Sequence, residues 1–146
     1  MLRGAHAVTL DTKGRLIVPA KVRAEVPCSE WIITLDIHEP CLLGYPLAVW
    51  EGIEKALLDL PNVDKDVRAL QRWLVGNATS VILDAQGRLL IPRVLCDHAR
   101  LQKEVIWVGL GQKFELWDEM AWKEEGQRFK AIEKTAQGEV WQGLKL

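Results

Sequence analysis

Two copies of an Asp-x-x-x-Arg motif occur in the sequence, and each places a carboxylate four residues before a guanidinium. The segments Val8–Pro19 and Val81–Pro92 align at an offset of 73 residues and share seven of twelve positions. About one identity is expected by chance from ordinary residue usage. An aspartate can fix a tight turn by accepting backbone N–H groups, and an arginine beside the turn can bind an anion. The duplication therefore predicts two related turns, each with an arginine at its base.

The residue types inside each motif predict its local structure. Aspartate at the first position and glycine at the last are typical of a tight turn in which the glycine takes a positive φ. We therefore expect Asp11 and Gly14 to shape the first turn, and Asp84 and Gly87 to shape the second. An arginine on the strand that follows can enter the major groove of DNA and bind guanine through two hydrogen bonds, while nearby cations bind phosphates.

Basic residues are concentrated at the start of the chain, although the formal net charge of the whole chain is −1. Residues 1–23 carry five basic side chains against Asp11 alone, a balance of +4, whereas residues 31–80 have a balance of −3. A near-neutral total argues against a polycation that holds nucleic acid by bulk electrostatics. The distribution indicates a local basic edge, at which Arg15 contacts a base while Lys13 and Arg23 contact phosphates. The candidate DNA-binding residues are Lys13, Arg15, Lys21, Arg23 and, in the second copy, Arg88.

A purely structural role is the alternative for both motifs, with the aspartate closing the turn and the arginine pairing with it. The second copy favours this role more than the first. Gln86 replaces Lys13 there, and Val94 and Cys96 align with the two cations of the segment that follows the first turn.

The elements that must position these motifs are short strands and helices. Apolar runs rich in Val, Ile, Leu and Trp alternate with Gly, Pro and Asp, which is typical of a strand, turn, strand, short helix, strand, strand unit. The sequence predicts short helices over 20–26 and 93–101, packing helices over 46–60 and 64–74, and a last helix over about 119–134. We divide the chain into a first repeat at 5–50, connecting helices at 51–77, a second repeat at 78–122, and a C-terminal helix and tail at 123–146.

The repeat also predicts the architecture. A unit of four short strands cannot bury both of its faces, so two copies in one chain should interlock about a pseudo-twofold axis. We expect an α+β fold, mainly β with packing helices, in which the two units close into one β-barrel core.

Composition excludes several classes of protein. At 146 residues, 49% hydrophobic and 27% charged, the chain is long enough for an ordinary globular core. Three scattered cysteines and no clustered histidine suggest neither a disulfide framework nor a metal site. The apolar core of a signal peptide is missing, which predicts a cytoplasmic protein without membrane contact. No convergent set of nucleophile and base is found, so we predict no catalytic residues, cofactor or small-molecule substrate.

Six segments resemble the bacterial MraZ family in order and spacing, and the match extends to about residue 125. They are Leu2–Ala5, Leu10–Arg15, Pro40–Pro46, Gly76–Ala78, Leu83–Arg88 and Lys113–Asp118. A single copy of the motif would be similar only to the broader AbrB-like swapped-hairpin proteins. The chain departs from the family pattern at Leu2, where an aromatic residue is favoured, and in its C-terminal tail.

The resemblance implies a function and a site. It implies a nucleoid-associated transcriptional regulator that binds double-stranded DNA at direct repeats in the promoter of its own division and cell-wall operon. It further implies two AbrB-like swapped-hairpin repeats and a ring-like homo-oligomer, in which linked weak contacts gain affinity. The family's DNA contacts map onto Lys13 and Arg15, with Arg3 as a helper. An oligomeric protein-interaction module and an AbrB-like antitoxin are the alternatives.

Overall fold

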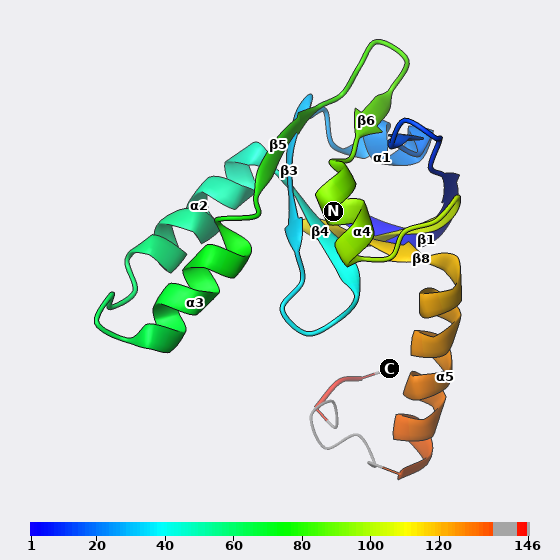
Figure 1. Cartoon of the computed structure of the whole chain (residues 1–146). Helices are drawn as coiled ribbons and strands as arrows, with labels where there is room; N and C mark the ends of the chain where they lie inside the picture. Colours follow the sequence, from blue (N-terminus) through cyan, green and yellow to red (C-terminus); the bar gives the residue numbers. More distant parts are fainter. Residues whose placement is uncertain (136–142, 146) are drawn as a thin grey trace.

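The computed structural model describes residues 1–135 and 143–145, in which strands and helices alternate in an α+β fold (Figure 1). The main sheet is antiparallel, with the strand order β1-β7-β8-β4-β3-β5, and β2 and β6 form a separate two-stranded ribbon. The strands are β1 (Leu2–Thr9), β2 (Arg15–Ile17), β3 (Glu30–Leu35), β4 (Cys41–Pro46), β5 (Thr79–Ile82), β6 (Arg88–Leu90), β7 (Glu104–Gly111) and β8 (Lys113–Asp118). The helices are α1 (Ala20–Glu25), α2 (Leu47–Leu58), α3 (Lys65–Leu74), α4 (Arg93–His98) and α5 (Glu119–Thr135).

The two repeats exchange strands, as the sequence predicts. Strand β1 of the first repeat pairs with β7 of the second, and β5 of the second pairs with β3 of the first. The registers of these two ladders correspond: Thr9 faces Glu104, and the equivalent residues Ile82 and Glu30 face each other. Each repeat therefore completes the sheet of the other.

Two strand pairs lie on the pseudo-twofold axis that relates the repeats. In the β2–β6 ribbon Leu16 faces Leu89, its own counterpart in the repeat. At the centre of the main sheet, Leu43 of β4 likewise faces Glu115 of β8. The pseudo-twofold axis exchanges the two strands within each of these pairs. It therefore runs through the ribbon and through the middle of the main sheet.

The core fills the space between the ribbon and one face of the main sheet. Leu16 and Leu89 point inward from the ribbon and are almost completely buried. They belong to one cluster with Trp31, Trp107 and Phe114, in which the Trp107 and Phe114 rings stack with centroids 3.6 Å apart. Large aromatic side chains bury extensive apolar area, so this cluster holds the ribbon against the sheet.

A closed barrel is not found among the described residues, and this part of the predicted fold is not confirmed. The two sheets meet at an isolated bridge between Leu10 and Leu16, and no continuous ladder joins the ribbon to β1 or β5. The shortness of β2 and β6 explains this, because Pro19 and Pro92 follow them closely and proline has no N–H to donate to a ladder.

The predicted helices are present, some with earlier ends than expected. Asp64 caps α3 by accepting the Asp66 N–H at 2.8 Å. Helix α2 stops at Leu58 instead of Leu60, since the residue before Pro61 is kept out of the helical region. Helix α4 stops before Arg100, whose φ of 53° is left-handed. The predicted tail at 123–146 lies partly outside the described residues.

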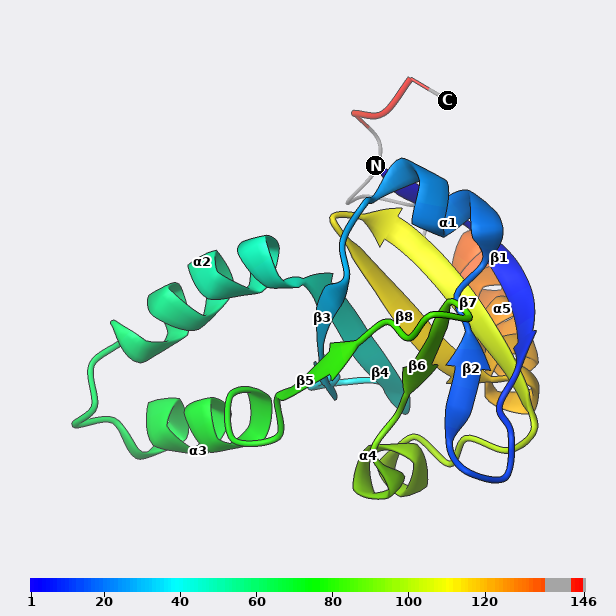
Figure 2. The ribbon, with the colours of Figure 1, turned by 90° about the horizontal axis from the view of Figure 1, so that it is seen from above.

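The helices leave the ribbon uncovered on its outer side. Figure 2 shows β2 and β6 facing the viewer, with α2 and α3 extending away from the sheet. Helix α5 packs on β7 and β8 through the contact of Trp122 with Trp117. Ile17 and Leu90 on the outer side of the ribbon are accordingly exposed to solvent.

Candidate nucleic-acid interface

The first turn is built around the carboxylate of Asp11. Its Oδ1 accepts the backbone N–H groups of Lys13 and Arg15, each at 2.9 Å, and its Oδ2 accepts Nε of Arg15 at 2.9 Å. Gly14 takes a φ of 83°, and a Cβ there would lie 2.9 Å from the carbonyl oxygen of Ile91. The carboxylate of Asp11 and the positive φ of Gly14 therefore define the geometry of this turn.

The second turn repeats this geometry. Asp84 accepts the backbone N–H groups of Gln86 and Arg88 at 2.9 Å, and Nε of Arg88 at 2.8 Å. Gly87 takes a φ of 77°. Both Asp-x-x-x-Arg motifs are thus ion pairs within a turn, as the structural alternative expects. The ion pair uses only one of the five N–H donors of each guanidinium, because the four N–H groups on the two Nη atoms take no part in it.

The two arginines differ in how free those Nη atoms are. Nη2 of Arg88 donates a long hydrogen bond of 3.4 Å to Oε1 of Gln86. Lys13 occupies the equivalent place in the first turn and has no acceptor to offer. Within the described residues, the Nη atoms of Arg15 have no protein partner. Arg15 therefore has unpaired N–H donors on both Nη atoms, while its Nε is bonded to Asp11.

The outer face of the ribbon joins both arginines into one surface. Arg15 faces Leu90 and Arg88 faces Ile17 across the two strands, while Leu16 and Leu89 point to the core. Ile17 and Leu90 are more than half exposed, at 55% and 56%. We call this set of four outward side chains, Arg15, Ile17, Arg88 and Leu90, the ribbon face.

The other predicted cations do not gather at the first turn. Arg23 lies beside the second turn, because a Cβ on Gly87 would be 2.6 Å from its Nη1, and its Nε donates to the Val18 carbonyl at 3.2 Å. Lys21 is exposed on α1. Arg3 is near the start of β1, roughly 20 Å along the strand from the turn. The balance of +4 over residues 1–23 is therefore spread over both turns and the sheet edge.

Apart from Lys13, the cations beside the first turn come from the second repeat, and the sequence pattern does not identify them. A surface groove of about 710 Å³ separates that turn from α4, and Lys13, Arg93 and Lys103 line it. Asp97, which pairs with Arg93 at 3.4 Å, also lines the groove. The signal that could have found these residues is the exchange of strands, which brings each turn next to the helix of the other repeat.

The turn carboxylates are held in the ionised state. The backbone N–H of Arg15, followed by its side chain, lowers the pKa of Asp11 below the usual value for aspartate. The backbone and side chain of Arg88 lower the pKa of Asp84 in the same way. Both ion pairs therefore persist at neutral pH, where the arginines are also charged.

Two other features of the described residues concern metal binding and membrane spans. A further cluster, formed by Asp36, Cys41 and Glu115, brings together side chains that could hold a metal ion. None of the helices in the described part of the chain has the length and apolar character to cross a membrane.

Comparison with known proteins gives a consistent result over nearly the whole chain. A family model described as "MraZ protein, putative antitoxin-like" matches twice, over residues 1–73 and 74–140. Relatives from several bacteria carry the name "Transcriptional regulator MraZ". The protein of Hydrogenovibrio crunogenus is 41% identical over 145 residues, with 97% of this chain and 94% of that protein covered. That of Thioalkalivibrio sulfidiphilus is 48% identical over 141 residues, with 94% and 93% covered.

The third relative, from Legionella pneumophila strain Corby, is 42% identical over 138 residues, with 92% of this chain and 91% of that protein covered. Among solved structures, the solution structure of PHS018 from Pyrococcus horikoshii matches at 14% identity and a TM-score of 0.34, with 80% of this chain and 88% of that chain covered. This structural likeness is too low to bear on fold or function.

Proposed function

The chain belongs to the MraZ family, and we propose that it is a sequence-specific DNA-binding transcriptional regulator, not an enzyme, that acts on the promoter of its own operon. The names of the relatives support regulation of transcription. In this proposal the operon carries division and cell-wall genes, its promoter contains direct repeats, and the regulator is cytoplasmic and nucleoid-associated.

The observation that carries the proposal is the ribbon face. A two-stranded β-ribbon fits the major groove of DNA. Here the ribbon carries two arginines, each of which forms an ion pair with the aspartate of its own turn. The unpaired Nη groups of Arg15 suit bidentate hydrogen bonds to the O6 and N7 atoms of guanine. Ile17 and Leu90 provide apolar surface between the arginines, where they can contact thymine methyl groups.

Phosphate contacts would come from the cations around this face. Lys13, Arg93 and Lys103 border the first turn, and Arg23 borders the second with Lys21 nearby on α1. Such contacts position a protein on DNA without reading sequence. Arg3 is the most distant candidate, and in this proposal it contacts DNA only beyond the groove that the ribbon enters.

Binding of one chain to one repeat would be weak, because the basic surface is small. A ring-like homo-oligomer would present several ribbon faces to successive direct repeats. Linked contacts of this kind raise the affinity through effective concentration without any new contact. The proposal therefore includes self-association as part of DNA recognition.

The test is binding of the purified full chain to the DNA upstream of its own gene, compared with shuffled DNA of the same composition. Arg15→Ala should lose about 1–3 kcal/mol of binding free energy and most of the sequence preference. Arg72→Ala, which removes an exposed arginine from α3, is the matched control and should bind like the unchanged protein. Equal binding to both DNAs, or unchanged binding by Arg15→Ala at matched salt, would contradict the proposal.

The same experiment separates the regulator from the first alternative. An oligomeric protein-interaction module would show no salt-dependent affinity for DNA. An antitoxin, which the description of the family model mentions, would require a partner protein in addition to any DNA. The ribbon face favours the DNA-binding regulator, since its half-buried arginines present N–H donors that suit an anionic partner.

A further inference from the structure

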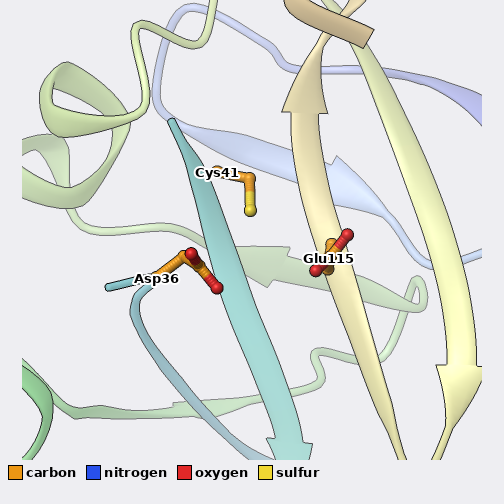
Figure 3. A group of neighbouring side chains, drawn as sticks. All are labelled: Asp36, Cys41 and Glu115. Carbon is orange, nitrogen blue, oxygen red and sulfur yellow. The ribbon is translucent and has the colours of Figure 1, made fainter. Parts of the chain in front are cut away.

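A second group of reactive side chains lies on the opposite face of the main sheet from the ribbon. Along β8, Phe114 and Leu116 point into the core, so Glu115 between them points to the other side. Asp36 follows the end of β3 and Cys41 begins β4 (Figure 3). One ligand atom from each of Asp36, Cys41 and Glu115 lies within 4.8 Å of the other two.

The protein already orients both carboxylates. Oδ1 of Asp36 accepts the backbone N–H groups of His38 and Glu39, each at 2.7 Å. Nε1 of Trp117 donates to Oε1 of Glu115 at 2.9 Å. Hydrogen bonds of this kind orient the ligands of metal sites and tune their basicity. One oxygen of each carboxylate is thus fixed by the protein, and Lys113 contacts the remaining oxygen of Glu115 only at 3.9 Å.

The thiol of Cys41 provides an independent observation. The residue is 3% exposed, and its sulfur makes no hydrogen bond to any residue that the structure describes. The other two cysteines differ, because Cys28 donates to the Glu30 carbonyl at 2.7 Å and Cys96 to the Ile91 carbonyl at 3.8 Å. Figure 3 shows Cys41 turned toward the space between the two carboxylates. A buried thiol without a partner therefore points into a cluster of ligand oxygens.

We propose that Asp36, Cys41 and Glu115 bind one divalent transition-metal ion of the zinc class, with water in a fourth position. One thiolate sulfur and two carboxylate oxygens suit Zn²⁺ or Co²⁺, whereas Mg²⁺ and Ca²⁺ prefer oxygen ligands alone. The step replaces the S–H bond of Cys41 by a metal–sulfur bond and releases one proton to solvent. With bonds of about 2.3 Å to sulfur and about 2.0–2.2 Å to oxygen, the ligand atoms must close by about 1 Å.

The repeat architecture shows that the fold does not require this cluster. The pseudo-twofold axis places Leu43 opposite Glu115 and relates Cys41 to Lys113. The counterparts of Cys41 and Glu115 therefore carry no thiol and no carboxylate, and the described residues form one such site. The site also adjoins α5, because Arg128 donates to Glu39 at 3.1 Å in the loop between Asp36 and Cys41. A bound ion would tie this loop to β8.

Burial and the neighbouring carboxylates favour the protonated form of the Cys41 thiol. Burial, followed by the charges of Glu115, Asp36 and Glu39, raises the pKa of the Cys41 thiol well above its ordinary value. A metal ion that binds the sulfur of Cys41 must displace the thiol proton, as at other cysteine ligands. The same carboxylates that hold the proton on sulfur are the groups that would neutralise the ion.

The experiment is a Co²⁺ titration of the full chain, reduced and free of added metal. We expect near-ultraviolet charge-transfer absorption from the thiolate, saturation at one Co²⁺ per chain, and displacement by Zn²⁺ but not by excess Mg²⁺. Cys41→Ser should abolish this absorption, whereas Cys96→Ser, the matched control at another buried cysteine, should retain it. The absence of absorption in the unchanged protein, or its persistence in Cys41→Ser, would overturn the proposal.

Two further measurements guard against a variant that fails to fold. Glu115→Gln keeps the thiol and should weaken the Co²⁺ affinity by at least about tenfold, in line with losses at other metal sites. Binding of Co²⁺ should also quench the fluorescence of Trp117, which contacts Glu115 directly. If Glu115→Gln bound Co²⁺ with unchanged affinity while folded by circular dichroism, the assignment of Glu115 and the proposed site would be wrong.

Discussion

Replacing Asp11 by asparagine separates the two roles of its carboxylate. The amide oxygen can still accept the backbone N–H groups of Lys13 and Arg15 that Oδ1 accepts. The amide nitrogen would stand where Oδ2 accepts Nε of Arg15 at 2.9 Å, and two donors would then face each other. Asp11→Asn therefore preserves the turn while it releases the guanidinium of Arg15.

The expected magnitude follows from this release. In the unchanged protein Asp11 immobilises Arg15 before DNA arrives, whereas in the variant the DNA must do so. Ordering a side chain with many rotamers costs about 0.5–1.5 kcal/mol, so the affinity for the upstream DNA should fall about two- to tenfold. Arg15→Ala removes the contact itself and should cost more, about 1–3 kcal/mol. Binding to shuffled DNA should not fall, since the variant also removes a negative charge.

The assay is a double-mutant cycle measured by fluorescence anisotropy on upstream and shuffled DNA at matched salt. If Asp11 acts through Arg15, then Asp11→Asn should have no further effect in a chain that already carries Arg15→Ala. Asp84→Asn is the matched control at the second turn, where Gln86 still holds Arg88. Independent, additive losses from Asp11→Asn and Arg15→Ala would refute the idea that Asp11 positions the arginine.

Four further predictions test the interface and the turns. Lys13→Ala should weaken binding to upstream and shuffled DNA alike and reduce the salt slope by about one unit, whereas Lys65→Ala on α3 should do neither. Gly14→Ala should destabilise the fold by about 1 kcal/mol or more in urea unfolding, because its φ is 83° and the Cβ would meet the Ile91 carbonyl. Gly52→Ala, a helical position with open space around it, should instead be neutral or stabilising. Ile17→Ala should make binding less sensitive to the replacement of thymine by uracil in the upstream DNA, and an undiminished preference for thymine would exclude this contact. Because the pKa values of Asp11 and Asp84 are lowered by folding, their contribution to stability is present above about pH 4 and is lost as the pH falls through the lowered values. The urea midpoint should therefore fall in acid, and fall less in a chain that carries both Asp11→Asn and Asp84→Asn.

The sequence predicted the turns and the exchange of strands because both depend on local or repeated patterns. Asp11 and Asp84 accept the backbone N–H groups that turn chemistry requires, so four residues were enough to infer each turn. The interlocking of the repeats follows from a duplication too small to close on itself. The closed barrel did not follow, because β2 and β6 are too short to continue the ladders of the main sheet.

The sequence did not predict which side chains surround each turn. Arg23 is eight residues after Arg15 in the chain but lies against Gly87, since α1 packs at the turn of the other repeat. Arg93 lies beside the first turn for the same reason. Cys41 and Glu115 are far apart in the sequence and become neighbours only through the pairing of β4 with β8. Spacing rules for metal ligands therefore could not find that cluster.

The same exchange suggests why the proposed target is a direct repeat and not a palindrome. A surface with true twofold symmetry would read inverted half-sites, because each half presents the same groups. The ribbon face has a pseudo-twofold backbone, but its chemistry is unequal: Arg15 is open beside Lys13, while Arg88 is bonded to Gln86. The two ends of the ribbon face along the DNA therefore differ, so the face can bind a given sequence in one orientation only. Successive chains related by the rotation of a ring would repeat that orientation, so each would meet the same sequence in the same orientation.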